Sequence, residues 1–287
     1  MRQGLRGTVW VGAIAILLLS GIRADAADVK TTRPKGPEVK SAAALVVDGH
    51  SGEVIYELKP ALVAPIASIT KLMTALVVLD AKQPLDEVIE ITSADRWKGK
   101  GAFSRLPVGA KLTRADLMRL ALMASENRAA QTLGRAYPGG TPAFIRAMNA
   151  KAKALGMTKS HFADASGLSN SNVSTARDLA KLVAAASRNS VIREYSTLDS
   201  FDVRLGKQMF RYSNTNLLIG RPDWNILVQK TGFTNDAGQC LVMEAMIDER
   251  PVIMVLMNSF GTLTRTADAR RIRRWMQAQQ TPKVAGN

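Results

Sequence analysis

The chain has 287 residues, 46% of them hydrophobic, with a formal net charge of +15 at pH 7. A single cysteine, Cys240, excludes an intramolecular disulfide, and its apolar surroundings predict a buried, inert thiol. The positive charge predicts attraction to anionic polymers, but no run of basic residues alternates with aromatics, so nucleic acid is not expected as a partner.

The N-terminus has the pattern of a signal peptide. Arg2 and Arg6 precede an apolar run over residues 9–19, and Ala24-Asp25-Ala26 is a small-x-small cleavage site. We therefore expect a signal peptide over residues 1–26, cut after Ala26, and export to the periplasm. An uncleaved anchor is the alternative. Cleavage would remove three arginines and one aspartate and leave a net charge of +13.

One domain is predicted for most of the remaining chain. Residues 27–40 are charged, contain two prolines and predict a flexible linker. Residues 41–277 show no Pro/Gly/Ser-rich break and no repeat, which suits one large domain with two lobes. Residues 278–287 form a polar tail that contains a proline.

The first half of the domain begins with strands and continues with helices. A β-hairpin is predicted over residues 43–48 and 54–58, with a Gly-rich turn between them. A helix is expected to follow Ser68, and a short strand is expected over residues 88–92. Further helices are predicted over the ranges 113–123, 125–136, 142–155 and 175–187.

The end of the chain changes character. Three apolar strands are predicted over residues 226–230, 240–246 and 252–257, and short turns should make them antiparallel. A basic helix over residues 264–276 follows. This order predicts an α/β (α+β) fold, in which both chain ends form one antiparallel sheet flanked by helices, with an all-helical lobe inserted between them.

Ser68 and Lys71 form a Ser-x-x-Lys motif at the start of a predicted helix. Residues three apart share a helix face, so the Lys71 amine should lie beside the Ser68 hydroxyl. A neutral lysine can remove the proton that makes serine a poor nucleophile. Taken alone the motif is weak, because most such pairs are helix surface.

Two further motifs supply the other parts of an acyl-transfer site. Ser125-Glu126-Asn127 offers a hydroxyl and a carboxamide at a boundary between helices, where Ser125 could equally be a helix cap. Lys230-Thr231-Gly232 ends a predicted strand, so a cation and a hydroxyl could hold a carboxylate while Gly232 lets a substrate backbone approach.

The three motifs, in this order, resemble those of the penicillin-interacting serine enzymes. The likeness extends over residues 42–276 and includes the segments around Pro65–Thr74, Ser104–Gly109, Ser125–Ala130 and Asp164–Ser169. The chain is similar to the serine D-Ala-D-Ala peptidases, the low-molecular-mass penicillin-binding proteins, and within them most to the endopeptidase type. The resemblance implies a β-lactamase/transpeptidase-like fold.

The resemblance also implies a role for each motif residue. Ser68 would be the acyl-ester nucleophile and Lys71 its base, with a pKa depressed by burial and by the charge of Lys230. Ser125 would relay a proton to the leaving amine, and Asn127 would orient Lys71 and the substrate amide. Substrate binding is expected from Lys230, Thr231 and Gly232, and the oxyanion hole from the backbone N–H groups of Ser68 and Phe233.

The resemblance implies hydrolysis of D-Ala–diaminopimelate cross-links in peptidoglycan, with β-lactams as covalent inhibitors. The alternative is a carboxypeptidase that trims pentapeptide stems. We prefer the endopeptidase because the carboxypeptidases of the family carry an extra β-domain and a C-terminal amphipathic helix, whereas this sequence ends in the polar tail.

Three other functional classes are disfavoured by the sequence. A class A β-lactamase also needs a glutamate that activates the deacylating water, and no Glu-x-x-Leu-Asn surrounds Glu194. A catalytically silent binding module is disfavoured by the complete motifs. A triad built on His50 or His161 has nothing in its favour.

The two histidines also lack a zinc-type spacing, so neither a metal nor another cofactor is expected. The partners predicted are peptidoglycan stem peptides and β-lactams. The net positive charge leaves peripheral association with anionic membranes open, and the sequence leaves the oligomeric state open.

Overall fold

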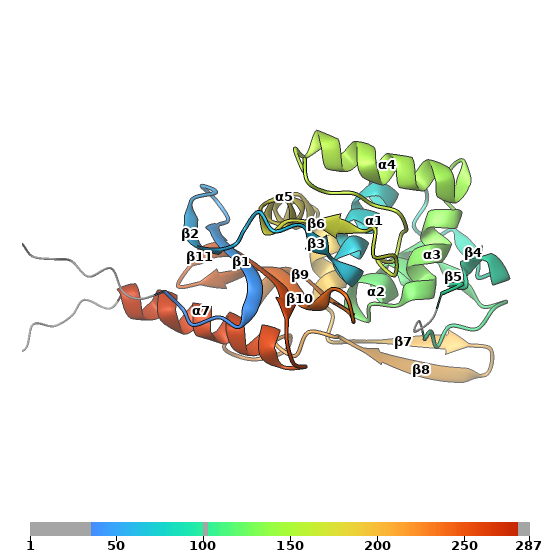
Figure 1. Cartoon of the computed structure of the whole chain (residues 1–287). Coiled ribbons are helices and arrows are strands. Elements are labelled where there is room, and N and C mark those ends of the chain that lie inside the picture. Colours follow the sequence, from blue (N-terminus) through green and yellow to red (C-terminus); the bar gives the residue numbers. More distant parts are fainter. Residues whose placement is uncertain (1–35, 100–102, 281–287) are drawn as a thin grey trace, which may run out of the picture. The chain divides into compact units, whose positions relative to one another are not determined.

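The two ends of the domain together form the central sheet (Figure 1). The structure, a computed structural model, describes residues 36–99 and 103–280, so the predicted signal peptide and most of the linker lie outside it. The sheet has the strand order β2-β1-β11-β10-β9. Its strands are β1 (Ser41–Asp48), β2 (Val54–Leu58), β9 (Asn225–Thr234), β10 (Gly238–Ile247) and β11 (Arg250–Ser259). The predicted sheet from both chain ends is confirmed.

Strand β1 lies beside β11, although more than two hundred residues separate them in the sequence. The pairing is antiparallel, with Ser41 opposite Ser259 and Asp48 opposite Val252. The side chains of Ser41 and Ser259 are also hydrogen bonded at 2.7 Å. The buried carboxylate of Asp268, on the C-terminal helix, accepts hydrogen bonds from the backbone N–H groups of Lys40 and Ser41 at 3.0 and 2.8 Å.

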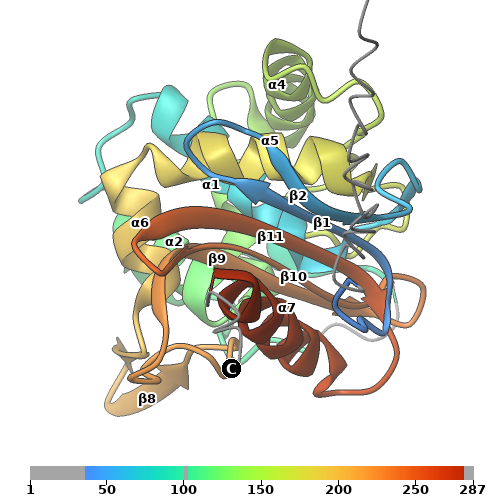
Figure 2. The ribbon, with the colours of Figure 1, turned by 90° about the vertical axis from the view of Figure 1, so that its left-hand side faces the viewer.

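Helices cover both faces of the sheet, which explains why its strands are apolar at consecutive positions. Helix α5 (Ala176–Ser187) lies on one face and α7 (Thr264–Gln280) on the other (Figure 2). Because side chains alternate along a strand, Ala43, Leu45 and Val47 join the core on the α5 side, whereas Ala44 and Val46 pack on the α7 side.

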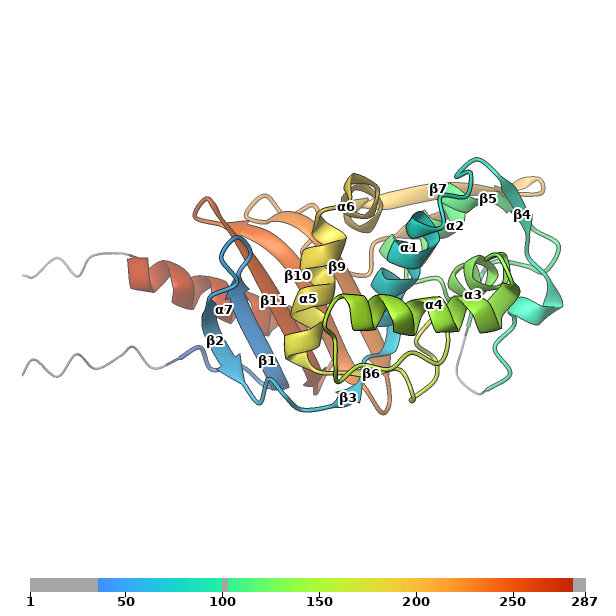
Figure 3. The ribbon, with the colours of Figure 1, turned by 90° about the horizontal axis from the view of Figure 1, so that it is seen from above.

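The inserted lobe is built from helices that gather beside the sheet (Figure 3). Thr113 caps α2, because its hydroxyl accepts a hydrogen bond from the N–H of Asp116 at 3.1 Å. The helices are α1 (Thr70–Asp80), α2 (Arg114–Met123), α3 (Asn127–Arg135), α4 (Gly140–Ala154) and α6 (Ser190–Thr197). Among the described residues, no helix is both long and apolar enough to cross a membrane.

Short strand pairs connect these parts. They are β3 (Ala64–Pro65) with β6 (Val173–Ser174), β4 (Val88–Glu90) with β5 (Lys111–Thr113), and β7 (Ser200–Leu205) with β8 (Gln208–Ser213). Two 3-10 turns, η1 (Ala67–Ile69) and η2 (Ser93–Asp95), complete the elements. Helix α6 and the β7–β8 hairpin were not among the elements predicted. Helix α7 runs to Gln280, three residues into the predicted polar tail, whose remaining residues lie outside the described part.

Candidate active site

Ser68 lies in the turn η1, immediately before helix α1 begins at Thr70. Ala67, the residue before it, has φ +47°, a left-handed conformation that a residue with a Cβ adopts only at a cost. The η1–α1 junction puts the Lys71 amine next to the serine, and Lys71 Nζ donates to Ser68 Oγ at 2.8 Å. The contact predicted from their spacing is present.

Lys71 is completely buried and makes three hydrogen bonds. Besides Ser68 Oγ, its Nζ donates to Asn127 Oδ1 at 2.8 Å and to the backbone carbonyl of Ser166 at 2.7 Å. Both of these latter atoms can only accept a hydrogen bond. If the ammonium loses one proton, its two remaining N–H groups still serve them, and its lone pair faces the Ser68 hydroxyl.

The environment of Lys71 favours that neutral form. Burial lowers the pKa of Lys71 to about 7, and the negative charges of Asp164 and Glu126 oppose this shift. Lys230 was also expected to depress the pKa of Lys71. In the structure the repulsion between the two lysines instead contributes to the low pKa of Lys230.

Ser125 precedes helix α3, and Asn127 is the first residue of that helix. Ser125 has φ +59°, and its hydroxyl makes no hydrogen bond to another residue of the described part. The N-cap of α3 is Glu126, so the cap alternative for Ser125 is wrong. The left-handed turn lets α3 start where the Asn127 amide reaches Lys71.

Glu126 is an acid beside the site that the sequence reasoning passed over. It is buried and accepts a hydrogen bond from the Ser104 hydroxyl, and burial raises the pKa of its carboxyl. Ser104 and Glu126 belong to two separate segments of the family likeness, Ser104–Gly109 and Ser125–Ala130. Their side-chain contact could not be inferred from the residues alone.

Lys230, Thr231 and Gly232 lie in β9, an edge strand of the sheet. Lys230 and Thr231 are buried, and Thr231 Oγ1 is 2.5 Å from Thr215 Oγ1. Burial, followed by the charges of Lys71 and Arg265, holds the pKa of Lys230 well below its usual value. An arriving carboxylate would favour the charged form of Lys230 and be attracted to it.

Gly232 lies close to the turn that carries Ser68. A Cβ at this position would lie 2.9 Å from the carbonyl oxygen of Ile66 and 3.2 Å from the backbone nitrogen of Ser68. The missing side chain therefore lets β9 lie directly against the turn that carries Ser68. Phe233, the next residue of the strand, carries the second N–H expected in the oxyanion hole.

Arg265, on the first turn of α7, was missed by the sequence reasoning. Its guanidinium donates to the carbonyl oxygens of Gly232 and Cys240 at 2.8 and 3.2 Å. Arg265 thus fixes the end of β9 and adds positive charge near Lys230. Cys240 itself is buried, and burial raises the pKa of its thiol to about 11, as expected for an inert cysteine.

The loop that contains Asp164 and Ser166 provides the carbonyl group that accepts a hydrogen bond from Lys71. Asp164 Oδ1 accepts hydrogen bonds from the N–H groups of Ser166 and Gly167 at 2.6 and 2.8 Å. Buried Asn172 donates to the Asp164 carbonyl and to Thr70 Oγ1, both at 3.0 Å. These bonds aim the Ser166 carbonyl at the amine.

The two histidines lie apart from these motifs. His50 occupies the turn between β1 and β2, and the backbone of His161 pairs with Val173. Ser68 has no hydrogen bond to either residue among the described contacts. The described residues contain no group of three or more potential metal ligands from His, Cys, Asp and Glu.

Ser68 is hydrogen bonded to the buried Lys71, and strand β9 places the buried Lys230 close to this pair. This arrangement defines a serine acyl-transfer enzyme of the transpeptidase type. The model of the peptidase S11 family, described as D-alanyl-D-alanine carboxypeptidase, matches residues 29–261, and the chain belongs to this family. It is a serine D-Ala-D-Ala peptidase with an α/β transpeptidase-like fold.

Curated relatives are similar in sequence to this chain over most of their length. A D-alanyl-D-alanine endopeptidase of Pseudomonas aeruginosa is 48% identical over 257 residues, which cover 89% of this chain and 83% of the relative. A D-alanyl-D-alanine endopeptidase of Escherichia coli is 47% identical, covering 88% and 82%. The carboxypeptidase DacA of E. coli is 28% identical, covering 92% of this chain and 67% of DacA.

Solved structures show the same fold. The Streptomyces K15 DD-transpeptidase superposes with a TM-score of 0.79 at 26% identity, over 85% of this chain and 99% of that one. Penicillin-binding protein D2 of Listeria monocytogenes, solved in a cefotaxime-bound form, gives 0.75 at 30% identity, over 84% and 98%.

Proposed function

We propose that this peptidase is a D-alanyl-D-alanine endopeptidase that cleaves D-Ala–diaminopimelate cross-links in peptidoglycan. The geometry that carries the acyl-transfer chemistry is the buried Lys71 amine bonded to Ser68 Oγ. The choice of endopeptidase over carboxypeptidase is supported by relatives of that name at 47–48% identity, against 28% for DacA. The family description names a carboxypeptidase, but its model matches a core that both types share, so we give the full-length relatives more weight.

The catalytic step follows from the contacts of Ser68. Its oxygen attacks the carbonyl carbon of the D-alanyl residue while neutral Lys71 takes the hydroxyl proton. The oxyanion is bound by the N–H groups of Ser68 and Phe233. When the intermediate collapses, the amide C–N bond breaks and the proton passes from Lys71 through Ser125 to the leaving amine, giving an acyl-enzyme that water hydrolyses.

Substrate orientation is assigned to the remaining motif residues. Asn127 holds Lys71 through its Oδ1 and presents its amide N–H₂ to the substrate. Lys230 and Thr231 bind the anionic end of the substrate, and Gly232 keeps β9 against the serine. Each role is a proposal that rests on the positions described above.

Penicillins should acylate Ser68 and be released slowly. Two acids lie near Lys71: Asp164 accepts hydrogen bonds from its own loop, and buried Glu126 accepts one from Ser104. Glu194 is exposed on α6, so none of the three corresponds to the glutamate that activates the deacylating water in a class A β-lactamase. Rapid steady-state hydrolysis of a penicillin by the purified protein would contradict this proposal.

The place of action proposed is the periplasm. Its basis is the predicted signal peptide over residues 1–26, the predicted linker over residues 27–40 and the cell-wall activity of the family. The protein would act as one catalytic domain from residue 41 onward. The net charge of +13 that remains after the proposed cleavage also supports peripheral contact with anionic surfaces of the envelope.

The test compares two substrates with purified protein. Cross-linked dimeric muropeptide should be converted to monomers, whereas pentapeptide monomer should lose its terminal D-Ala more slowly. Ser68→Ala should abolish both reactions and labelling by a fluorescent penicillin. Loss of D-Ala from pentapeptide without cleavage of the dimer would favour the carboxypeptidase, and absence of labelling in the wild type would favour a silent binding module.

A further inference from the structure

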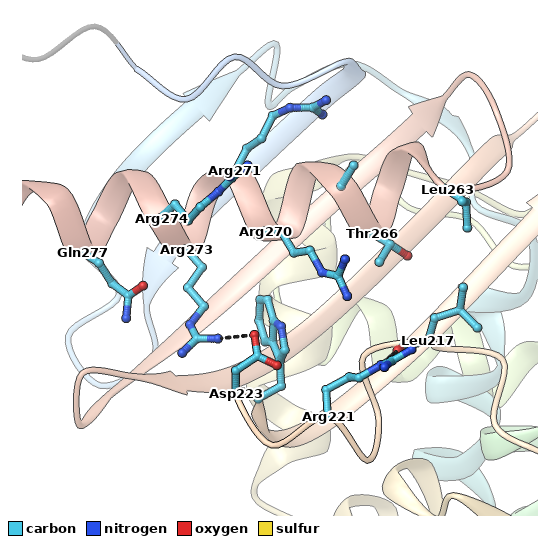
Figure 4. A pocket seen from close by; sticks show the side chains of 12 residues that line it. Leu217, Arg221, Asp223, Leu263, Thr266, Arg270, Arg271, Arg273, Arg274 and Gln277 are labelled. Carbon is cyan, nitrogen blue, oxygen red and sulfur yellow. Dashed lines mark hydrogen bonds and ion pairs between the residues drawn. The ribbon is translucent and has the colours of Figure 1, made fainter.

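A basic groove runs along helix α7, and none of the catalytic motif residues lines it (Figure 4). It is a cavity of about 780 Å³ between α7 and the segment that joins β8 to β9. Leu217 and Leu263 lie at its apolar part, and both are more than half exposed. We call it the arginine groove, after its lining residues Arg221, Arg270, Arg271, Arg273 and Arg274.

The positive charge of the arginine groove is only partly neutralised within the protein. Arg273 pairs with Asp223 at 2.8 Å, and Arg271 pairs with Asp268 at 2.6 Å. Arg270 and Arg274 are exposed and form no ion pair with any residue between 36 and 280 that the structure describes. Two guanidinium groups on one side of the helix are therefore available to an external anion.

The floor of the groove is aromatic. Trp224 is 92% buried there, and its indole N–H has no acceptor within the described residues. The guanidinium of Arg273 lies over its ring, 5.2 Å from the ring centre. The groove therefore combines unpaired cations and an aromatic floor, with apolar surface at its edge.

Each wall of the groove has a leucine close in sequence to a residue that contacts β9, the strand that carries Lys230. On the helix side, Arg265 follows Leu263 by two positions and bonds the Gly232 carbonyl. On the other side, Leu217 follows Thr215 by two positions, and Thr215 bonds the Thr231 hydroxyl. From Leu263 to Gln277 the groove follows α7 over about 20 Å.

We propose that the arginine groove binds carboxylate-bearing peptide chains of peptidoglycan that extend beyond the scissile bond. This proposal rests on the proposed function, which makes that polymer the substrate. Arginine forks bind carboxylates through two parallel hydrogen bonds, and the alkyl parts of a stem peptide can contact Leu217 and Leu263. A chain held at Lys230 and Thr231 would reach the groove at Leu217 and Leu263, which lie two positions from the β9-contacting residues Thr215 and Arg265.

The binding test uses full-length protein carrying Ser68→Ala, so that the polymer is not cut. Arg270→Gln/Arg274→Gln removes two unpaired charges from the groove. Arg146→Gln/Lys153→Gln removes the same charge from exposed positions on α4 and is the matched control. In co-sedimentation with purified peptidoglycan, the groove variant should bind roughly threefold to twentyfold more weakly, and the control should change less than about twofold.

The activity test uses the same pairs of substitutions with Ser68 intact. The groove variant should need a higher concentration of intact peptidoglycan for half-maximal cleavage, whereas its acylation by fluorescent penicillin and its thermal unfolding should match the wild type. Equal losses of binding in both variants, or none in either, would overturn the proposal.

Two further outcomes separate the remaining explanations. Loss of binding to phosphatidylglycerol vesicles, with peptidoglycan binding unchanged, would assign the groove to a lipid surface and also overturn the proposal. Groove-dependent binding by the Ser68→Ala protein, combined with no cleavage of any cross-link by the wild type, would sustain the groove and reject the proposed endopeptidase activity.

Discussion

The protonation state of the Lys71 amine decides whether it can accept the proton of the Ser68 hydroxyl. The pKa of Lys71 is lowered to about 7 by burial, so the neutral base becomes the main form above that pH. Acylation by a penicillin should therefore rise about tenfold per pH unit below pH 7 and level off above it. Stopped-flow labelling across pH checks this, and a rate that does not change between about pH 5 and pH 9 would contradict Lys71 as the base.

Asp164 should set where this rise occurs. Its negative charge raises the pKa of Lys71, so Asp164→Asn should lower that pKa and move the acidic limb of the acylation profile to lower pH. Asp178→Asn is the matched control, because Asp178 is also a buried carboxylate that accepts backbone and hydroxyl hydrogen bonds. A shift of equal size in both variants would show that loss of stability, not charge, is responsible.

The sequence predicts some of these contacts and not others. Ser68 and Lys71 are three residues apart on a helix, so their contact follows from helical geometry. The Ser166 carbonyl lies 95 positions from Lys71, and no local pattern specifies that meeting. Glu126 and Ser104 are separated by 22 positions and by two other elements, and their contact depends on how the helices pack.

At the scale of elements, the fit between β9 and η1 sets the positions of Ser68 and Phe233, whose N–H groups we propose as the oxyanion hole. Gly232→Ala would force the Ile66 carbonyl away, since the new Cβ would lie 2.9 Å from it. We expect acylation to slow on the order of tenfold to a hundredfold while the fold is kept.

Gly206→Ala is the control for this prediction. Gly206 has φ +63° in the turn between β7 and β8 and open space around its Cβ position, so alanine should cost stability there without reaching Ser68. Labelling rates and thermal unfolding should be measured on both variants. Normal acylation in Gly232→Ala would show that β9 and the serine turn adjust independently.

Strong apolar strands were predictable, whereas weakly patterned elements were not. Strands β10 and β11 are long and buried, and most of their residues are apolar, while β9 contains an apolar run over residues 226–228. The β7–β8 hairpin is largely exposed, and its strands mix charged with apolar residues, so no face stands out. Helix α6 has only eight residues, too few to establish a helical period.

At the scale of the whole molecule, Asp268 fastens the N-terminal strand to the C-terminal helix. Its buried carboxylate accepts from the Lys40 and Ser41 backbone and the Ser41 hydroxyl, and it pairs with Arg271. Asp268→Ala leaves these donors without their acceptor and should lower the free energy of unfolding by about 3 kcal/mol.

Chemical denaturation monitored by tryptophan fluorescence measures this loss. Asp223→Ala serves as the control, because Asp223 also pairs with an arginine of α7 but is exposed, so its removal should cost less than about 1 kcal/mol. Equal losses in the two variants would mean that burial of Asp268 adds nothing to the closure of the sheet.

The pairing of β1 with β11 also has a consequence for how the chain acquires activity during synthesis. A nascent chain on the ribosome contains Ser68 and Lys71 early, but β1 then has only β2 beside it, and its second neighbour, β11, is complete only when residue 259 has been made. The strand that carries Lys230 is likewise absent until late. Contacts between such distant residues slow folding, since a long loop must close before they form. We therefore expect a translation product that ends before β11 to lack the completed sheet and to be enzymatically inactive.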